Sequence, residues 1–201
     1  MPYRTKTRSG KPKEPPTGNA VYEMAVKALA RRTRSTAEVR TFLVQRGASE
    51  ADIGDAIVRL RDHGYLDDER FARLFVHSRI ENEGHGAGRV RRDLAKKRVG
   101  REIAEQAVAS GYEQLNEKDL LRDYLRRKLR LAKPPSKASA LATLYQRLLR
   151  AGFSSATIVK ELQGLNSAKR HGSDGPSIDP DKWREWIESL ADSTDEDAET
   201  E

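Results

Sequence analysis

The chain of 201 residues is long enough for one ordinary domain or an array of small repeats. Hydrophobic residues make up 36% and charged residues 34%, which favours thin elements that each bury one stripe over a single thick core. Cysteine is absent, so disulfide scaffolds, cysteine nucleophiles and thiolate metal sites are excluded. No apolar run is long enough to span a membrane, and the N-terminus lacks the apolar centre of a secretory signal. We therefore expect a cytoplasmic protein with no membrane partner.

The charge is divided unequally along the chain. The formal net charge is +7, yet residues 174–201 contain 11 acidic and 2 basic residues, which leaves +16 on the rest. A basic body with an acidic end indicates a polyanionic partner, nucleic acid first. A soluble helical protein that is merely rich in lysine and arginine is the alternative.

The first elements are read from apolar spacing and capping residues. Residues 1–19 combine basic residues with prolines and have little to bury, so we expect a disordered basic arm. Residues 21–32 predict a helix. Ser35 and Glu38 form a capping box at the start of the next helix, which Gly47 ends.

The remaining elements continue the same pattern. Ser49 is expected to cap a helix that ends at Gly64, and Asp67 to cap the one after it. A glycine-bearing segment, 84–88, precedes a short helix. Later helices are predicted around the apolar or capping residues Ile103, Asn116, Leu121, Leu125, Leu144 and Ser154. No run alternates apolar and polar residues, so no sheet is predicted.

Apolar and turn residues recur at fixed intervals. Five positions recur 105 residues later: Val39, Leu43, Gly47, Ser49 and Ile53 correspond to Leu144, Leu148, Gly152, Ser154 and Ile158. Val90 and Leu94 follow Val39 and Leu43 by 51 residues, and Ile103 fits after a one-residue gap. We predict an all-α fold of three tandem three-helix repeats in an elongated, curved array with disordered tails. The predicted segments are the arm 1–19, repeats at 20–66, 67–112 and 113–166, and a tail, 167–201.

The predicted tail contains both tryptophans of the chain. After a polar linker, Asp179 and Pro180 predict a helix start. The stripe on that helix consists of Trp183, Trp186, Ile187 and Leu190. Such an amphipathic helix could pack back on the body or enter a partner's groove, and an acidic end follows it.

Three patterns in the sequence are candidate chemical sites. His77, Glu81 and His85 have helical spacing for a metal, but nearby glycines should fray the helix there. Residues 67–69 are acidic and fit the first turn of a helix. Residues 84–89 could be an anion-binding helix start or a flexible loop. We predict no catalytic residue, no metal and no cofactor.

Basic residues cluster on two predicted helices. One cluster runs from Arg89 to Arg101, and on the other helix arginines recur every four residues. Phosphate contacts need only well-placed cations; an ordinary solvated face is the alternative. With 6% aromatic residues, base stacking is not expected, so any DNA binding should be weakly sequence-specific. The candidate polyanion-binding residues are Arg89, Arg91, Arg92, Lys96, Lys97, Arg122, Arg126, Arg127 and Arg130.

One segment resembles the signature of the RecX family. It reads Gly64-Tyr65-Leu66-Asp67-Asp68-Glu69-Arg70-Phe71-Ala72, and the segment 34–40 also matches. The resemblance spans roughly residues 20–164 and is weaker in the third repeat. We expect the turn residues Gly64, Tyr65, Leu66, Asp67, Asp68 and Phe71 to be mainly structural, with Tyr65 packed between repeats. Arg98-Val99 stands where the family usually has Lys-Gly, which puts that turn's geometry in question.

The resemblance implies a regulatory protein that binds the RecA recombinase. In that family the protein lies in the deep groove of the RecA–DNA filament. There it restrains ATP hydrolysis, strand exchange and the coprotease activity that drives the SOS response. The basic residues above would then be filament contacts. An independent DNA-binding protein built on helix-turn-helix-like units is the alternative. Because no coiled-coil seam is present, we expect a monomer.

Overall fold

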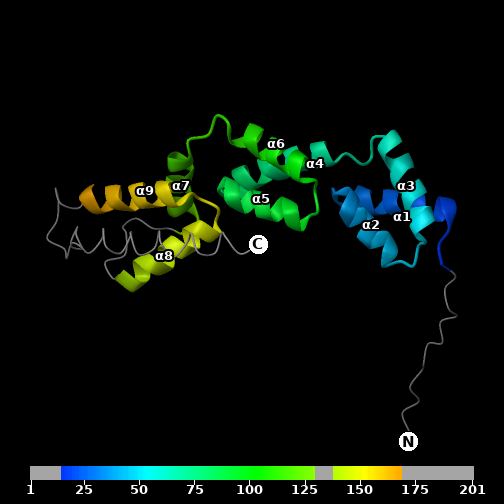
Figure 1. Ribbon diagram of the computed structural model, residues 1–201, viewed down its shortest axis with the longest axis horizontal. Helices are drawn as coiled ribbons and strands as arrows, with labels where there is room; N and C mark the ends of the chain where they lie inside the picture. Colours follow the sequence, from blue (N-terminus) through cyan, green and yellow to red (C-terminus); the bar gives the residue numbers. More distant parts are fainter. Residues whose placement is uncertain (1–14, 130–137, 169–201) are drawn as a thin grey trace, which may run out of the picture. The chain divides into compact units, whose positions relative to one another are not determined.

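The computed structural model describes residues 15–129 and 138–168. Over these ranges the chain is helical and has no strand, which confirms the all-α prediction (Figure 1). Most of the predicted arm, and the predicted tryptophan helix and acidic tail, lie outside the described residues. The elements are α1 (Gly18–Arg31), α2 (Thr36–Val44), α3 (Glu50–Asp62), α4 (Asp68–Ser78), the π-helix η1 (Arg79–Glu83), α5 (Ala87–Lys96), α6 (Arg101–Tyr112), α7 (Glu117–Arg127), α8 (Ala138–Arg150) and α9 (Ser155–Ala168).

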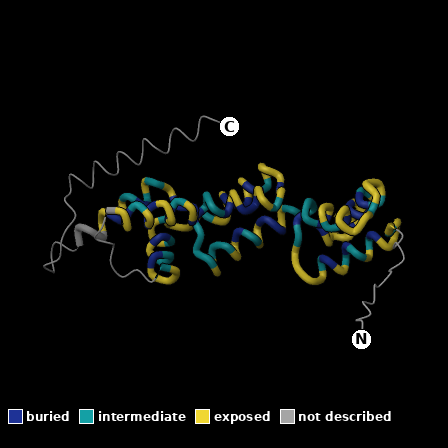
Figure 2. Tube along the Cα trace, turned by 90° about the horizontal axis from the view of Figure 1, so that it is seen from below, coloured by how far each residue is buried: buried dark blue, intermediate teal, exposed yellow. Residues whose placement is uncertain are grey.

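The chain divides into two compact units. Unit 1 comprises Met1–Phe71 together with Lys97–Val99, and unit 2 comprises Ala72–Lys96 and Gly100–Glu201. Along the described helices buried positions alternate with exposed ones, as expected of helices that each bury one stripe (Figure 2). The boundaries of the three predicted repeats remain a prediction.

The core of unit 1 lies between α1, α2 and α3. The predicted capping box is present: the Ser35 hydroxyl accepts the Glu38 backbone N–H, and the Glu38 carboxylate accepts the Ser35 backbone N–H. Ser49 caps α3 in the same way. The buried side chains are Val21, Ala25, Val39, Leu43, Ile53, Ala56, Ile57, Leu60 and Leu66.

The main core of unit 2 joins α7, α8 and α9, and its largest buried side chain is Tyr145. The Tyr145 hydroxyl has a partner in Ser155, 2.7 Å away. Helices α4 and α6 also pack closely in unit 2. A Cβ atom on Gly111 of α6 would lie only 2.5 Å from Val76 Cγ1 of α4. On α4, Val76 is buried, whereas the apolar residue Leu74 is 54% exposed.

The predicted recurrence at 105 residues is confirmed. Gly47 and Gly152 both have positive φ, 81° and 95°, and Ser49 and Ser154 both accept the amide of the third residue of the next helix. The corresponding apolar positions are all buried: Val39 and Leu144, Leu43 and Leu148, Ile53 and Ile158.

The recurrence at 51 residues needs a correction. Ala104, not Ile103, occupies the position equivalent to Ile53, since Ala104 is buried and Ile103 is only partly so. The caps agree, because Ser49 and Gly100 are the N-caps of α3 and α6. No gap is therefore required. The prediction chose Ile103 because isoleucine is a stronger apolar signal than the neighbouring alanine.

Candidate functional site

The signature turn after α3 is held by its backbone. Gly64 has φ 70°, and the N–H groups of Gly64 and Tyr65 donate to the carbonyls of Arg61 and Leu60 at 2.8 Å each. This bond pattern is that of a Schellman motif. It turns Leu66 into the core at 3% exposure. Tyr65 was expected to pack between repeats, and this is wrong: it is 53% exposed and lies edge-on to His63.

The acidic residues of the signature are caps. Asp67 Oδ1 accepts the Arg70 backbone N–H at 2.8 Å, which confirms it as the N-cap of α4. Asp68 lies in the first turn of α4, as predicted, and its Oδ1 also accepts the Thr36 backbone N–H at the start of α2, at 2.8 Å. Phe71 is buried at 8% exposure. These residues build the fold of unit 1.

Lys97 is held by the capping box of α2. Its ammonium lies 2.8 Å from Glu38 Oε1, and its carbonyl accepts the Ser35 hydroxyl at 2.7 Å. Burial alone would raise the pKa of Glu38, but the hydrogen bonds from Lys97 and the Ser35 backbone outweigh it and lower that pKa. Lys97 therefore has a structural partner in unit 1.

The glycine segment before α5 binds a helix end. The Gly86 and Gly88 N–H groups donate to the carbonyls of Ala151 and Gly152 at 2.9 and 3.1 Å. A Cβ on Gly86 would lie 2.3 Å from the Gly152 oxygen. The N-terminus of α5 thus satisfies the C-terminal carbonyls of α8, an arrangement in which opposite helix dipoles meet. Neither a flexible loop nor a free anion cradle describes this segment.

The candidate cations on α5 are all engaged. Arg89 Nε lies 3.1 Å from Asp93 Oδ2, and Arg91 Nε lies 2.9 Å from Glu105 Oε2. Arg92 donates to the carbonyls of Leu149 and Arg150 at 3.4 and 3.2 Å, which adds to the junction with α8. Lys96 lies 4.0 Å from Asp93 Oδ1. Arg92 is therefore engaged by the fold, whereas Arg91 and Lys96 are exposed and make ion pairs.

The arginines of α7 differ from one another. Arg122 has a side chain that is 49% exposed, and its Nε lies 2.6 Å from Oε1 of Glu161, a residue of α9 with 3% exposure. The Glu161 hydrogen bond raises the pKa of Arg122. Arg126 and Arg127 share the carboxylate of Asp123, and the hydrogen bond from Arg126 lowers the pKa of Asp123.

The predicted α7 band therefore separates into a structural pair and an exposed end. Arg122 joins α7 to α9 through the buried Glu161, so we expect its substitution to cost stability. The exposed end, which we call the α7 basic end, consists of Arg126, Arg127 and Lys128, three cations beside one acid. Arg130 lies outside the described residues.

Two other arginines stand out by having no partner within the described residues. Arg98, in unit 1, is exposed and has φ 53°, a left-handed conformation that costs a non-glycine residue about 1–2 kcal/mol. Arg101, in unit 2, is the first residue of α6 and is exposed. Both belong to the sequence cluster that runs from Arg89 to Arg101. Only the structure separates them from their paired neighbours.

The described residues hold no group of three or more His, Asp and Glu side chains arranged as metal ligands. The side chain of His85 is mostly buried, with Nδ1 3.3 Å from Glu83 Oε2 but without hydrogen-bond geometry. Burial lowers the pKa of His85, so the ring is neutral near pH 7. In the same ranges no helix has the length and apolar character needed to cross a membrane.

Two family models match the chain. One, described as the first three-helix domain of RecX, matches residues 22–60, and the other, the second three-helix domain of RecX, matches residues 67–108. The first match contains α2 and parts of α1 and α3, and the second contains α4, η1 and α5 and part of α6.

Several proteins named regulatory protein RecX are similar to this chain. One from Mycobacterium sp. (strain KMS) is 30% identical over 164 residues, which cover 78% of this chain and 90% of that protein. One from Vibrio parahaemolyticus is 40% identical over 87 residues, covering 43% of this chain. The match spans only 56% of the length of the Vibrio protein.

Solved structures agree with the fold. The crystal structure of RecX from Lactobacillus salivarius is similar with a TM-score of 0.59 and 24% identity, over 74% of this chain and 96% of that one. The two matched domains, together with the 30% identity to the mycobacterial protein over 90% of that protein's length, show that the chain belongs to the RecX family of regulatory proteins.

Proposed function

We propose that this protein binds the RecA–DNA filament in the cytoplasm as a monomer and inhibits RecA. ATP hydrolysis, strand exchange and coprotease activity would all be restrained, and with them recombination and the SOS response. Membership of the RecX family carries the proposal. The match to the mycobacterial regulatory protein covers 90% of that protein and 78% of this chain. The protein would act by binding alone, without a catalytic residue or cofactor of its own.

The α7 basic end is the surface we assign to the polyanion. The side chains of Arg126 and Arg127 are 75% and 70% exposed, and both share a single carboxylate, that of Asp123. Exposed ion pairs of this kind are weak, so a phosphate can replace the carboxylate at little cost. Arg98 and Arg101 are further candidates, because each keeps its full charge for a partner.

Three other candidates have roles in the fold. Arg92 binds the end of α8, Lys97 binds the capping box of α2, and Arg122 binds Glu161. A guanidinium or ammonium that already satisfies a buried or partly buried acceptor gains less from a phosphate, because the acceptor would be left unpaired. We expect their substitution to affect stability first.

Independent DNA binding is the second candidate function. The turns at Gly47 and Gly152 join helix pairs in the manner of helix-turn-helix motifs. The helix after the first turn, α3, carries four acidic residues and two arginines. Such a helix would be repelled by the phosphates that line a DNA groove, so filament binding is favoured.

The test is RecA ATP hydrolysis on single-stranded DNA. Substoichiometric wild-type protein should slow it, because a protein that contacts several protomers at once gains from effective concentration. The double variant Arg126→Glu/Arg127→Glu should lose most of this effect. A matched control, Lys27→Glu/Arg31→Glu on α1, makes the same change of charge on two exposed residues and should keep it.

Circular dichroism establishes that both variants are folded. An unchanged ATPase rate with the wild-type protein would reject the proposed function. Equal losses in the two variants would reject the α7 basic end as the contact and leave net charge as the cause.

A further inference from the structure

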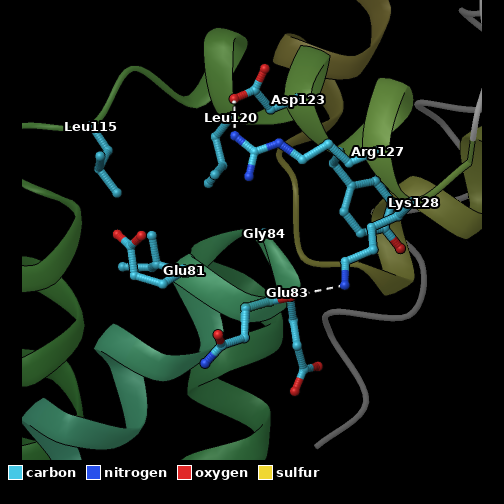
Figure 3. Close-up of a pocket in the computed structure, with 11 residues that line it drawn as sticks. Glu81, Glu83, Gly84, Leu115, Leu120, Asp123, Arg127 and Lys128 are labelled. Carbon is cyan, nitrogen blue, oxygen red and sulfur yellow. Dashed lines mark hydrogen bonds and ion pairs between the residues drawn. The ribbon is translucent and has the colours of Figure 1, made fainter.

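Unit 2 contains a cavity of about 310 Å³ between η1 and α7. Figure 3 shows Leu115 and Leu120 pointing toward Glu81, with η1 on the opposite side from α7. Leu115 is 41% exposed, so part of its apolar side chain is open to solvent beside the cavity. The apolar part of the lining consists of Ile80, Leu115, Leu120 and Tyr124.

The rim of the cavity is charged and fixed in place. Lys128 donates to the Asn82 carbonyl at 2.8 Å, which ties the end of α7 to η1. Arg127 lies 3.0 Å from Asp123, and both interactions are drawn in Figure 3. The α7 basic end therefore begins at the edge of the cavity. The carboxylates of Glu81, Glu83 and Asp123 also line the cavity, so the excess of positive charge is confined to the α7 basic end itself.

One segment of the chain combines an apolar stripe with acidic residues, as a partner for this cavity and the α7 basic end would. Residues 180–191, outside the described residues, place Trp183, Trp186, Ile187 and Leu190 on one predicted helix face. Residues 192–201 follow with six acidic and no basic residues. An apolar stripe followed at once by negative charge complements a cavity bordered at one end by cations.

We propose that residues 180–191 dock in this cavity, with the tryptophan stripe against Leu115, Leu120 and Tyr124. The acidic residues after Leu190 then lie along the α7 basic end. The occupant is this chain's own segment, and the docking is independent of the proposed function, because neither RecA nor DNA takes part in it.

The tether is long enough. Glu161 on α9 is paired with Arg122 on α7. From that pair, the end of α9 at Ala168 lies roughly 10 Å along one helix, and Lys128 lies roughly 9 Å along the other. Residues 169–179 can extend over roughly 36 Å. The segment can therefore reach the cavity of its own chain.

Tryptophan fluorescence tests the docking directly, because Trp183 and Trp186 are the only tryptophans in the chain. Cysteine is also absent, so a nitroxide can be placed on Leu115→Cys in the otherwise unchanged full-length protein. Leu74→Cys is the matched control, since Leu74 is also an exposed leucine of unit 2 but does not line the cavity.

The nitroxide on position 115 should reduce tryptophan emission by about twofold or more, because such quenching requires near-contact, whereas the label on position 74 should have little effect. Leu115→Asp should shift the emission maximum to longer wavelength, and Leu74→Asp should leave it unchanged. Circular dichroism controls for folding.

Equal quenching from the two positions would overturn the proposal, as would wild-type emission at the wavelength of fully hydrated tryptophan. Quenching that increases with protein concentration would place the segment on a second copy, and would overturn it too.

Discussion

The turns at Gly47 and Gly152 have the same local structure and different surroundings. At both, the glycine N–H donates to the carbonyl three residues back, at 2.9 Å in each case, and φ is positive. A Cβ on Gly47 would meet nothing within 4 Å, whereas one on Gly152 would lie 2.1 Å from the Arg89 backbone nitrogen. Local conformation is thus repeated along the chain, while tertiary contact is specific to one copy.

A third turn occupies the equivalent position between α5 and α6. There Arg98, 51 residues after Gly47, adopts φ 53° without being glycine. The left-handed conformation is therefore required by the repeat and not by the residue type. The same turn backbone is crowded by neighbouring atoms at Gly152, has free space around it at Gly47 and is strained at Arg98.

The largest effect is expected for Gly152→Ala. The new methyl group would lie 2.1 Å from the Arg89 backbone nitrogen and 2.6 Å from the Gly86 backbone oxygen. Backbone atoms cannot relieve such a clash by a change of rotamer. Overpacking and the positive φ together should cost about 4 kcal/mol. Urea unfolding measures this cost. A loss as small as that of Gly47→Ala would mean that α5 does not dock on α8 in this way.

The next effect concerns the caps after the two glycine turns. Ser49 bonds to Asp52 in its own helix, but the Ser154 N–H and hydroxyl both donate to Glu117 at 2.7 Å. Glu117→Gln should cost about 1 to 2 kcal/mol, less than for a fully buried carboxylate because solvent screens part of the site. Thermal unfolding at pH 7 provides the measurement.

The same carboxylate gives a pH dependence. Burial would raise the pKa of Glu117, but the hydrogen bonds from Thr157 and Ser154 outweigh it and lower that pKa. Its stabilisation is therefore complete above the unfolded pKa of about 4.3 and is lost as the pH falls through the lower folded pKa. Between pH 5 and pH 3, roughly, the wild-type protein should lose more stability than Glu117→Gln. Parallel losses would contradict the assigned role.

A smaller cost is expected for Gly47→Ala. No atom is in the way, so only the left-handed backbone opposes the methyl group. The reduced entropy of the unfolded chain offsets part of that cost, which leaves about 1 kcal/mol. The urea midpoint should fall slightly with an unchanged slope. A cost equal to that of Gly152→Ala would remove the contrast between the two turns.

The smallest effect has the opposite sign. Arg98→Gly relieves a left-handed arginine that has no partner within the described residues, so the protein should gain about 0.5 kcal/mol after the entropy of glycine is subtracted. Thermal unfolding should move upward. Destabilisation would show that the Arg98 side chain makes a stabilising contact of its own.

Sequence alone predicted what depends on neighbours along the chain. The capping box at Ser35, the N-cap at Asp67 and the glycine turn at Gly64 follow from residue types at short spacing, and all are present. The one-residue gap before Ile103 was wrong, because it followed the larger apolar residue instead of the cap at Gly100.

The candidate site was less predictable because pairing is a long-range property. Arg122 and Arg126 look equivalent in the sequence, yet Arg122 meets Glu161 from 39 residues away, while Arg126 meets Asp123 in its own helix. The glycines at 86 and 88 read as a loop for the same reason, since their acceptors lie on α8.

The central claim, that the partner is a RecA filament, is tested most directly by comparing two affinities. The labelled protein is titrated with single-stranded DNA alone and with the same DNA coated by RecA and a slowly hydrolysed nucleotide, at one salt concentration. We predict much tighter binding to the coated DNA, with a weaker salt dependence than for naked DNA. Equal affinities, or tighter binding to naked DNA, would contradict the claim and favour an independent DNA-binding protein.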